Sequence, residues 1–78
     1  MRSVISFVAD GIRLVYMDTN AIKSVEEHTS SPNSSWIVLS EDTLYEVNVP
    51  CTTVIEKIAE AVNASDQIGG FVCVSLSD

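Results

Sequence analysis

Residues 44–64 read LYEVNVPCTTVIEKIAEAVNA, which places a strand pattern directly before a helix pattern. Tyr45, Val47 and Val49 alternate with polar residues, and this period of two is typical of a strand with one buried face. Pro50 ends that strand because it has no amide hydrogen to donate to a sheet. The same residue suits the first turn of a helix, where the missing hydrogen costs nothing. The stretch therefore predicts a strand followed at once by a helix.

The helix is expected to span about residues 51–64 and to be amphipathic. Thr53 and Glu56 have the spacing of a capping box, which marks the helix start, and Asn63-Ala64-Ser65 marks its end. The apolar side chains share one stripe, which we expect to pack on one face of a sheet. That stripe holds Val54, Ile55, Ile58, Ala61 and Val62.

Strand patterns also occur before and after this stretch. Asp10-Gly11 is a dipeptide typical of tight hairpin turns, and Glu41-Asp42 marks a second turn. The further strands that these turns and the last apolar run predict cover residues 4–8, 12–17, 36–39 and 71–76.

Residues 20–28 permit two interpretations. Ile22 and Val25 are spaced as on a short helix, with Asp18 or Asn20 as its cap. The same segment fits a strand equally well. We favour a third strand, entered by a helical turn, because a hairpin pattern follows it.

Together these elements predict an α+β fold with one antiparallel sheet of four to six short strands. The helix is expected to pack on one face of that sheet, and the chain to end in a strand. Trp36 and Phe71 are expected to fill the core, and the Ser-rich stretch over 29–35 to form the main loop. A chain of this length can bury only one core, so residues 1–78 are expected to form a single domain.

The chain is strongly acidic, with eleven Asp and Glu against four Lys and Arg and a net charge of −7. This balance disfavours direct binding to nucleic acids or anionic membranes, because both need clustered Lys and Arg. No apolar run reaches the roughly 20 residues that cross a bilayer, so we expect a soluble, cytoplasmic protein. The charge either keeps a small domain in solution or forms a surface that meets a basic partner.

Residues able to carry chemistry are few. His28 is the single histidine and is expected to be solvated at a strand end, while Cys51 and Cys73 lack the spacing of a zinc site or a redox pair. Gly69-Gly70 is not followed by the Lys of a phosphate-binding loop. We therefore predict no catalytic residue, no metal site, no cofactor, and a function other than that of an enzyme.

Acidic residues at turns and outward strand positions are the candidates for partner binding. Glu41 and Asp42 lie at a predicted hairpin tip and Glu46 faces outward on the adjoining strand, so these three are expected to form one negative patch. Such carboxylates can pair with the Arg and Lys that normally hold phosphates. The predicted partner-binding residues are Asp10, Glu26, Glu27, Glu41, Asp42 and Glu46.

A homodimer is a further expectation, because a short sheet leaves open edges. The run over residues 71–76 carries no charge that would discourage strand pairing. Two copies are therefore expected to associate through this run.

One set of short patterns spans about residues 4–62: Asp10-Gly11, Asn20-x-Ile22 before Val25-Glu26-Glu27, Ile37-x-Leu39, Tyr45-x-Val47, and Val54-Ile55-Glu56-Lys57-Ile58. In these turn glycines, alternating strands and capped helix, the chain resembles the FlbD family of small flagellar-operon proteins. It departs from that family at Glu41-Asp42, in its longer Ser-rich loop and in the strand from Phe71. The resemblance implies a structural or assembly module that binds through an apolar patch or a sheet edge.

In size and acidity the chain also resembles small phage proteins that disable host factors by imitating the charge of DNA. That resemblance implies an inhibitor that occupies the basic surface of a host nucleic-acid-binding protein, such as the nucleoid protein HU or a CRISPR effector. Our first hypothesis is therefore a non-enzymatic interaction protein with an acidic binding surface, and the alternative is the FlbD-like module. Salt separates the two hypotheses, because binding through exposed charges weakens as ionic strength rises.

Overall fold

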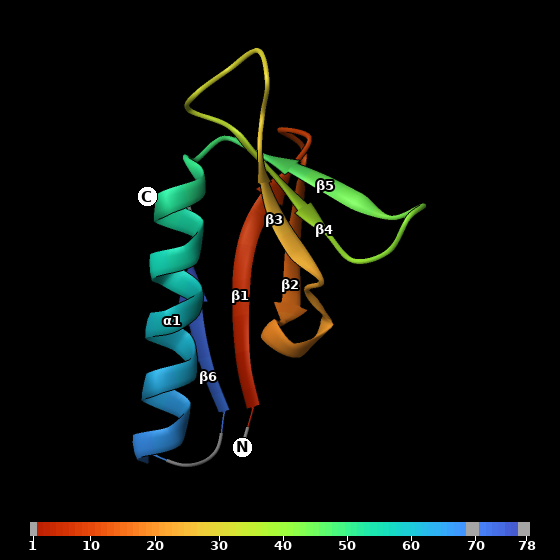
Figure 1. The fold of residues 1–78 in the computed structure, drawn as a ribbon. Coiled ribbons are helices and arrows are strands. Elements are labelled where there is room, and N and C mark those ends of the chain that lie inside the picture. The colour runs from red at the N-terminus through yellow and green to blue at the C-terminus, as the bar shows by residue number, and fades with distance from the viewer. Residues whose placement is uncertain (1, 69–70, 77–78) are drawn as a thin grey trace.

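The computed structural model describes residues 2–68 and 71–76, and these residues form the predicted α+β fold (Figure 1). Strands lie on both sides of one long helix in the sequence, so that the helix follows the fifth strand and precedes the sixth. In chain order the elements are β1 (Arg2–Ala9), β2 (Arg13–Asp18), the 3₁₀ turn η1 (Thr19–Ala21), β3 (Ser24–Glu27), β4 (Ser35–Val38), β5 (Leu44–Val47), α1 (Cys51–Ile68) and β6 (Phe71–Ser75).

The strands divide between two small sheets, whereas the sequence analysis expected one antiparallel sheet. Sheet A has the strand order β2-β1-β6 and sheet B the order β3-β4-β5. Sheet B is antiparallel throughout, but in sheet A the last strand runs parallel to β1. The helix makes this parallel pairing possible because it carries the chain from the end of sheet B back to the start of sheet A.

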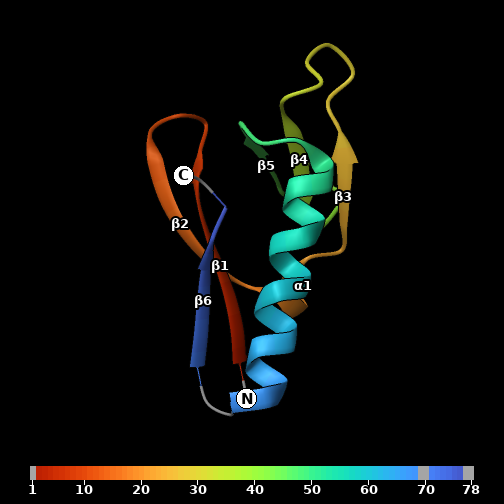
Figure 2. The ribbon, with the colours of Figure 1, turned by 90° about the vertical axis from the view of Figure 1, so that its left-hand side faces the viewer.

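Helix α1 packs across both sheets and closes the core between them (Figure 2). It contacts β1 and β6 of sheet A and β3 and β4 of sheet B, while β1 also contacts β5. Among the described residues, no helix is long and apolar enough to cross a membrane. The buried core residues are Ile5, Phe7, Ala9, Met17, Ile37, Val47, Val54, Ala61 and Leu76.

The helix begins at Cys51, within the predicted range, so Thr53 lies inside its first turn and is not its cap; the helix also ends later than predicted. Its first turn is closed by the Val54 amide, which donates to the Pro50 carbonyl at 3.1 Å. The predicted end at residue 64 is wrong, because the helix continues to Ile68. The apolar stripe is also narrower than predicted: Ile55 is 54% and Val62 37% exposed. Consecutive helical residues lie about 100° apart, so Ile55 turns away once its neighbour Val54 faces the core.

The first hairpin has the predicted turn. Asp10 and Gly11 both adopt positive φ values, 55° and 75°, and the Ile12 amide donates to the Ala9 carbonyl at 3.1 Å. Turns of this mirror-image kind match the right-handed twist of the strands they join. An Asp-Gly pair suits them because glycine and, less readily, aspartate tolerate positive φ.

The favoured interpretation of residues 20–28 is confirmed, since a 3₁₀ turn leads into β3. Asp18 caps this turn by accepting a hydrogen bond from the Asn20 amide at 2.9 Å, and Arg2 Nη2 lies 3.2 Å from its Oδ2. The Asn20 hydrogen bond, followed by the Arg2 guanidinium, holds the pKa of Asp18 below its ordinary value of 3.8.

The expectation that Trp36 fills the core is wrong. Trp36 is half-buried on the outward face of sheet B, while Ile37, the next residue, is fully buried. Side chains of a strand alternate between faces, so an apolar run cannot place all its members inside a two-faced sheet. The side chain of Phe71, the other expected core residue, lies outside the described part of the structure.

Two isoleucines differ enough in burial to test this core. Ile5→Ala is expected to lower the free energy of unfolding by about 2–5 kcal/mol, because Ile5 is fully buried. The same change at half-exposed Ile55 is expected to cost less than about 0.5 kcal/mol, since alanine favours helix and little packing is lost. Urea denaturation measures both values, and equal losses would contradict the arrangement of α1.

The cap at Asp18 predicts a pH dependence. A carboxyl with a lowered pKa in the folded state contributes stability above its unfolded pKa and loses that contribution as pH falls through the folded pKa. The wild-type protein is therefore expected to lose more stability than Asp18→Asn between about pH 5 and pH 2. Urea denaturation across that range measures the difference. Asp42→Asn is the control, because Asp42 has no hydrogen bond or ion pair to a described residue.

Candidate functional site

The six acidic residues predicted to bind a partner fall into two groups. Two of them are ion-paired within the chain: Asp10 Oδ2 lies 3.5 Å from Arg13 Nη2, and Glu46 Oε2 lies 2.9 Å from His28 Nε2. The other four lie on β3 of sheet B or in the turn between β4 and β5, and they form no ion pair with a described residue. We call these four carboxylates the acidic end: Glu26, Glu27, Glu41 and Asp42.

Strand pairing places the turn that carries Glu41 and Asp42 beside the start of β3. Val38 pairs with Ser24 of β3 on one side and Leu44 of β5 on the other, so the β4–β5 turn lies beside the start of β3. Backbone hydrogen bonds fix that turn, with the Leu39 amide donating to the Thr43 carbonyl at 2.9 Å. Glu41 of this turn therefore lies near Glu26, whereas Glu27 pairs with Ser35 at the opposite end of β3.

Glu26 and Glu41 line a single open hollow of about 310 Å³. Lys23 is the basic residue of this hollow, and Val38 and Leu44 supply apolar surface. Glu46, which the sequence analysis grouped with Glu41 and Asp42, is not part of it. The hollow can receive a long side chain with an apolar stem and a cationic head, such as that of arginine.

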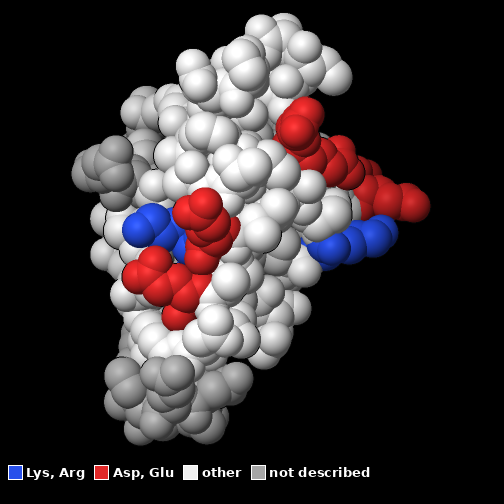
Figure 3. All heavy atoms as spheres, turned by 60° about the vertical axis from the view of Figure 1, so that its left-hand side comes forward, with Lys and Arg blue, Asp and Glu red and all other residues white. Residues whose placement is uncertain are grey.

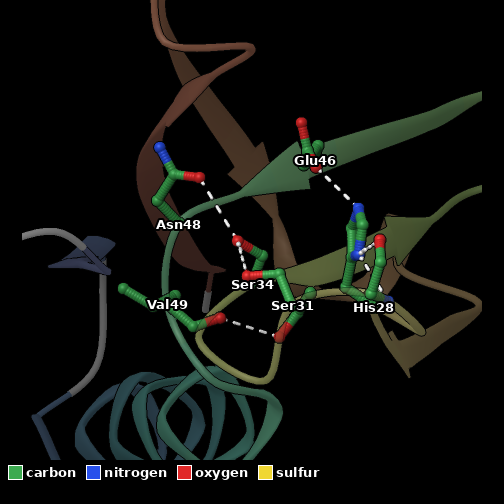
Figure 4. Close-up of polar contacts among 8 residues, drawn as sticks. His28, Ser31, Ser34, Glu46, Asn48 and Val49 are labelled. Atoms are coloured by element: carbon green, nitrogen blue, oxygen red, sulfur yellow. Dashed lines mark hydrogen bonds and ion pairs between the residues drawn. The ribbon is translucent and has the colours of Figure 1, made fainter.

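His28 is half-buried, so the expectation of a solvated histidine is wrong. Its ring stacks on Trp36, with ring centroids 5.0 Å apart and planes 15° apart, and only 17% of its side chain is exposed. The two ring nitrogens make polar contacts: Nε2 lies beside Glu46, and Nδ1 accepts a hydrogen bond from the Ser30 amide at 3.3 Å (Figure 4). These contacts hold the histidine at the end of β3.

The end of the Ser-rich loop is hydrogen-bonded to the segment between β5 and α1 (Figure 4). Ser34 Oγ donates to Asn48 Oδ1 at 3.4 Å, and Ser35 Oγ donates to the Val49 carbonyl at 2.8 Å. Ser35 is fully buried and begins β4, so the predicted loop is one residue too long. A buried hydroxyl needs such a partner, and the strand pattern alone does not reveal it.

Charge is distributed unevenly over the molecule. In residues 1–18 two Arg face two Asp, so all of the net charge of −7 lies in residues 19–78, where two Lys face nine Asp and Glu. On the face shown in Figure 3, the acidic side chains form two separate groups with basic side chains beside them. The negative charge on that face is therefore not one continuous patch.

The first hairpin exposes apolar side chains instead of charge. Leu14 is 60% and Tyr16 66% exposed, and Val8, which pairs with Leu14, is 39% exposed. Ile12, in the turn beside them, is 83% exposed. We call this group the hairpin face. This face was not predicted from the sequence, although residues 12–17 carry apolar side chains at both odd and even positions and only one set can face the core.

A second hollow and the two cysteines form no further polar site within the described part of the chain. A hollow of about 160 Å³ lies where β1 meets the end of β5, and apart from Asn48 its lining is apolar. The Cys51 thiol donates to the Val25 carbonyl at 3.9 Å, and Cys73 is exposed. Within the described residues, no three His, Cys, Asp or Glu side chains are close enough together to hold a metal ion.

The chain has no detectable relative in the three comparisons with known proteins. No family model matches it, no curated protein is significantly similar in sequence, and no solved structure is significantly similar in fold. The resemblances to the FlbD family and to phage DNA mimics therefore gain no support from these comparisons, and the function is inferred from the surface alone.

The contacts of His28 predict that this residue contributes to the stability of the fold. His28→Ala removes the stacking on Trp36 and the ion pair to Glu46, so it is expected to lower the free energy of unfolding by about 1 kcal/mol. Glu46→Gln removes only the ion pair and is expected to cost less. Urea denaturation followed by the fluorescence of Trp36, the single tryptophan, measures both. Glu26→Gln is the control, because Glu26 also pairs with Trp36 across the strands but forms no ion pair with His28.

Proposed function

We propose that the protein is a non-enzymatic interaction protein that binds a basic protein partner through the acidic end of sheet B. The observation that carries this proposal is the pairing of charges. Asp10, Asp18 and Glu46 have basic partners within the chain, whereas the four carboxylates of the acidic end have none among the described residues. Their charge is therefore available to another molecule.

Electrostatics at such a surface favour a partner rich in arginine. Each hydrogen bond between a carboxylate and a guanidinium contributes on the order of 1.5–3 kcal/mol when water is excluded, so a few pairs suffice for specific binding. The excess of acidic residues in 19–78 also speeds the approach of a basic molecule. The hollow between Glu26 and Glu41 gives one arginine a defined position.

The partner that fits this surface is a protein whose basic groove normally holds phosphates. Carboxylates on a rigid sheet can occupy the same Arg and Lys, so the bound protein would exclude nucleic acid by occupancy. The nucleoid protein HU and a CRISPR effector are members of this partner class. The molecule then acts as a DNA mimic and an inhibitor.

A charge reversal tests this proposal. The double variant Glu41→Lys, Asp42→Lys is expected to lose partner capture from a bacterial lysate, because it removes two carboxylates and adds two positive charges at the acidic end. The wild-type protein is expected to capture nucleic-acid-binding proteins at about 50 mM salt and much less at about 200 mM. Mass spectrometry identifies the captured proteins.

The matched control is Glu56→Lys, Glu60→Lys, which makes the same change in net charge on the exposed face of α1. This variant should retain most of the capture, because it leaves the acidic end intact. Capture that is indifferent both to salt and to the Glu41 and Asp42 reversal would disprove the proposal.

The hairpin face favours a second candidate function, that of an assembly module. Exposed apolar side chains gathered on one face mark contact surfaces, and Leu14 and Tyr16 have no role in the core. Binding through this face would depend little on salt. This candidate corresponds to the FlbD-like alternative of the sequence analysis.

A further inference from the structure

We infer that the hairpin face is a self-association surface, whose occupant is the hairpin face of a second copy of this chain. The contact consists of Leu14 and Tyr16 of β2 with Val8 of β1, and Ile12 of the turn lies beside it. The hairpin face does not include the acidic end. The molecule that covers it is a second copy of the same chain.

The distribution of charge over the chain favours this face for contact between two copies. Each copy carries −7, so most approaches bring like charges together. Residues 1–18 are the neutral part of the sequence, and their charges are compensated locally, because Arg2 pairs with Asp18 and Arg13 with Asp10. Two hairpin faces can therefore meet without the repulsion that opposes contact between two acidic ends.

The geometry of β2 allows a symmetric contact. Leu14 and Tyr16 project from the same side of β2, opposite to buried Met17, and the cross-strand partner of Leu14 on β1 is Val8. A two-fold axis places the same patch on both sides of the interface, so apolar side chains of one copy meet apolar side chains of the other. Uncharged faces with aromatic side chains are typical of interface cores.

The size of this face sets the strength of the association. The two strands of this hairpin, each of about six residues or more, cover a footprint of roughly 20 Å by 10 Å, from the rise per residue and the strand spacing. That footprint is smaller than the roughly 800 Å² per partner that stable complexes bury. We therefore expect a reversible dimer with a dissociation constant in the micromolar range.

The uncharged run over residues 71–76, by contrast, predicts a dimer contact at the other edge of sheet A. Those residues do form an edge strand, because β6 lies at the outside of sheet A. Its described side chains are smaller, however, and Val72 and Val74 are half-buried. The larger exposed apolar surface of sheet A belongs to the opposite edge, on β2.

Sedimentation of the full chain over about 1–200 μM tests the inference, a range that brackets the affinity expected for a small interface. The weight-average mass is expected to rise from the chain mass of 8.5 kDa towards twice that value. Leu14→Lys is expected to weaken association at least about tenfold, because it introduces charge into an apolar contact. Ile55→Lys is the matched control, since Ile55 is 54% exposed on α1 but lies outside the hairpin face, and it should associate as the wild type does.

Circular dichroism checks that each variant is folded, and Tyr16→Ser replaces Leu14→Lys if that variant is not. Raising salt from about 50 to about 500 mM is expected to leave the dimer unchanged or strengthen it, because salt screens repulsion between the acidic copies. The binding proposed for the acidic end has the opposite salt dependence, so the two ideas can fail separately. A monomer at every concentration, or equal effects of Leu14→Lys and Ile55→Lys, would overturn the inference.

Discussion

The fold depends on the burial of one face of β1. Ile5, Phe7 and Ala9 on this face are almost fully inaccessible to water, and they join one core with residues of α1 and of sheet B. The ring of Phe7 meets Tyr45 of β5 edge-on, with centroids 5.8 Å apart, which ties the two sheets together. A single layer of strands cannot bury its own apolar face, so each of these three-stranded sheets needs a second layer. Strand β1 and helix α1 supply the shared surface that allows both sheets to exist.

Sequence patterns predict the local elements of this protein well and their pairing poorly. Pro50 fixes the start of α1 because proline has a definite backbone requirement, but Asn63 and Ser65 did not end the helix, since such residues disfavour helix only weakly. Period-two alternation predicts strands without naming their partners. The parallel pairing of Arg2 with Phe71 joins opposite ends of the sequence, and no local pattern contains that information.

For the candidate site too, the sequence predicts the individual residues but not the contacts between them. The sequence identifies the acidic residues, and hairpin chemistry correctly places Glu41 and Asp42 in a turn. The sequence does not reveal that Glu26 and Glu41 line one hollow, or that His28 pairs with Glu46. Both arrangements join residues of different strands or turns, which no local pattern specifies. Nor does it reveal that Arg2 and Asp18 neutralise each other. The neutral stretch over residues 1–18 can be seen in the sequence, but the exposure of its apolar side chains on one face is a property of the folded state.

The parallel pairing of β1 with β6 has a kinetic consequence. Strands β3, β4 and β5 pair with sequence neighbours, so sheet B needs only short loops to close, whereas sheet A is incomplete until β6 reaches β1. Long loops close more slowly than short ones, so sheet B and the first hairpin are expected to form before β6 docks. During that interval β1 presents a free edge on the side that β6 later covers. An intermediate of this kind can accept β6 from another molecule, which makes strand exchange the characteristic misfolding route of this topology.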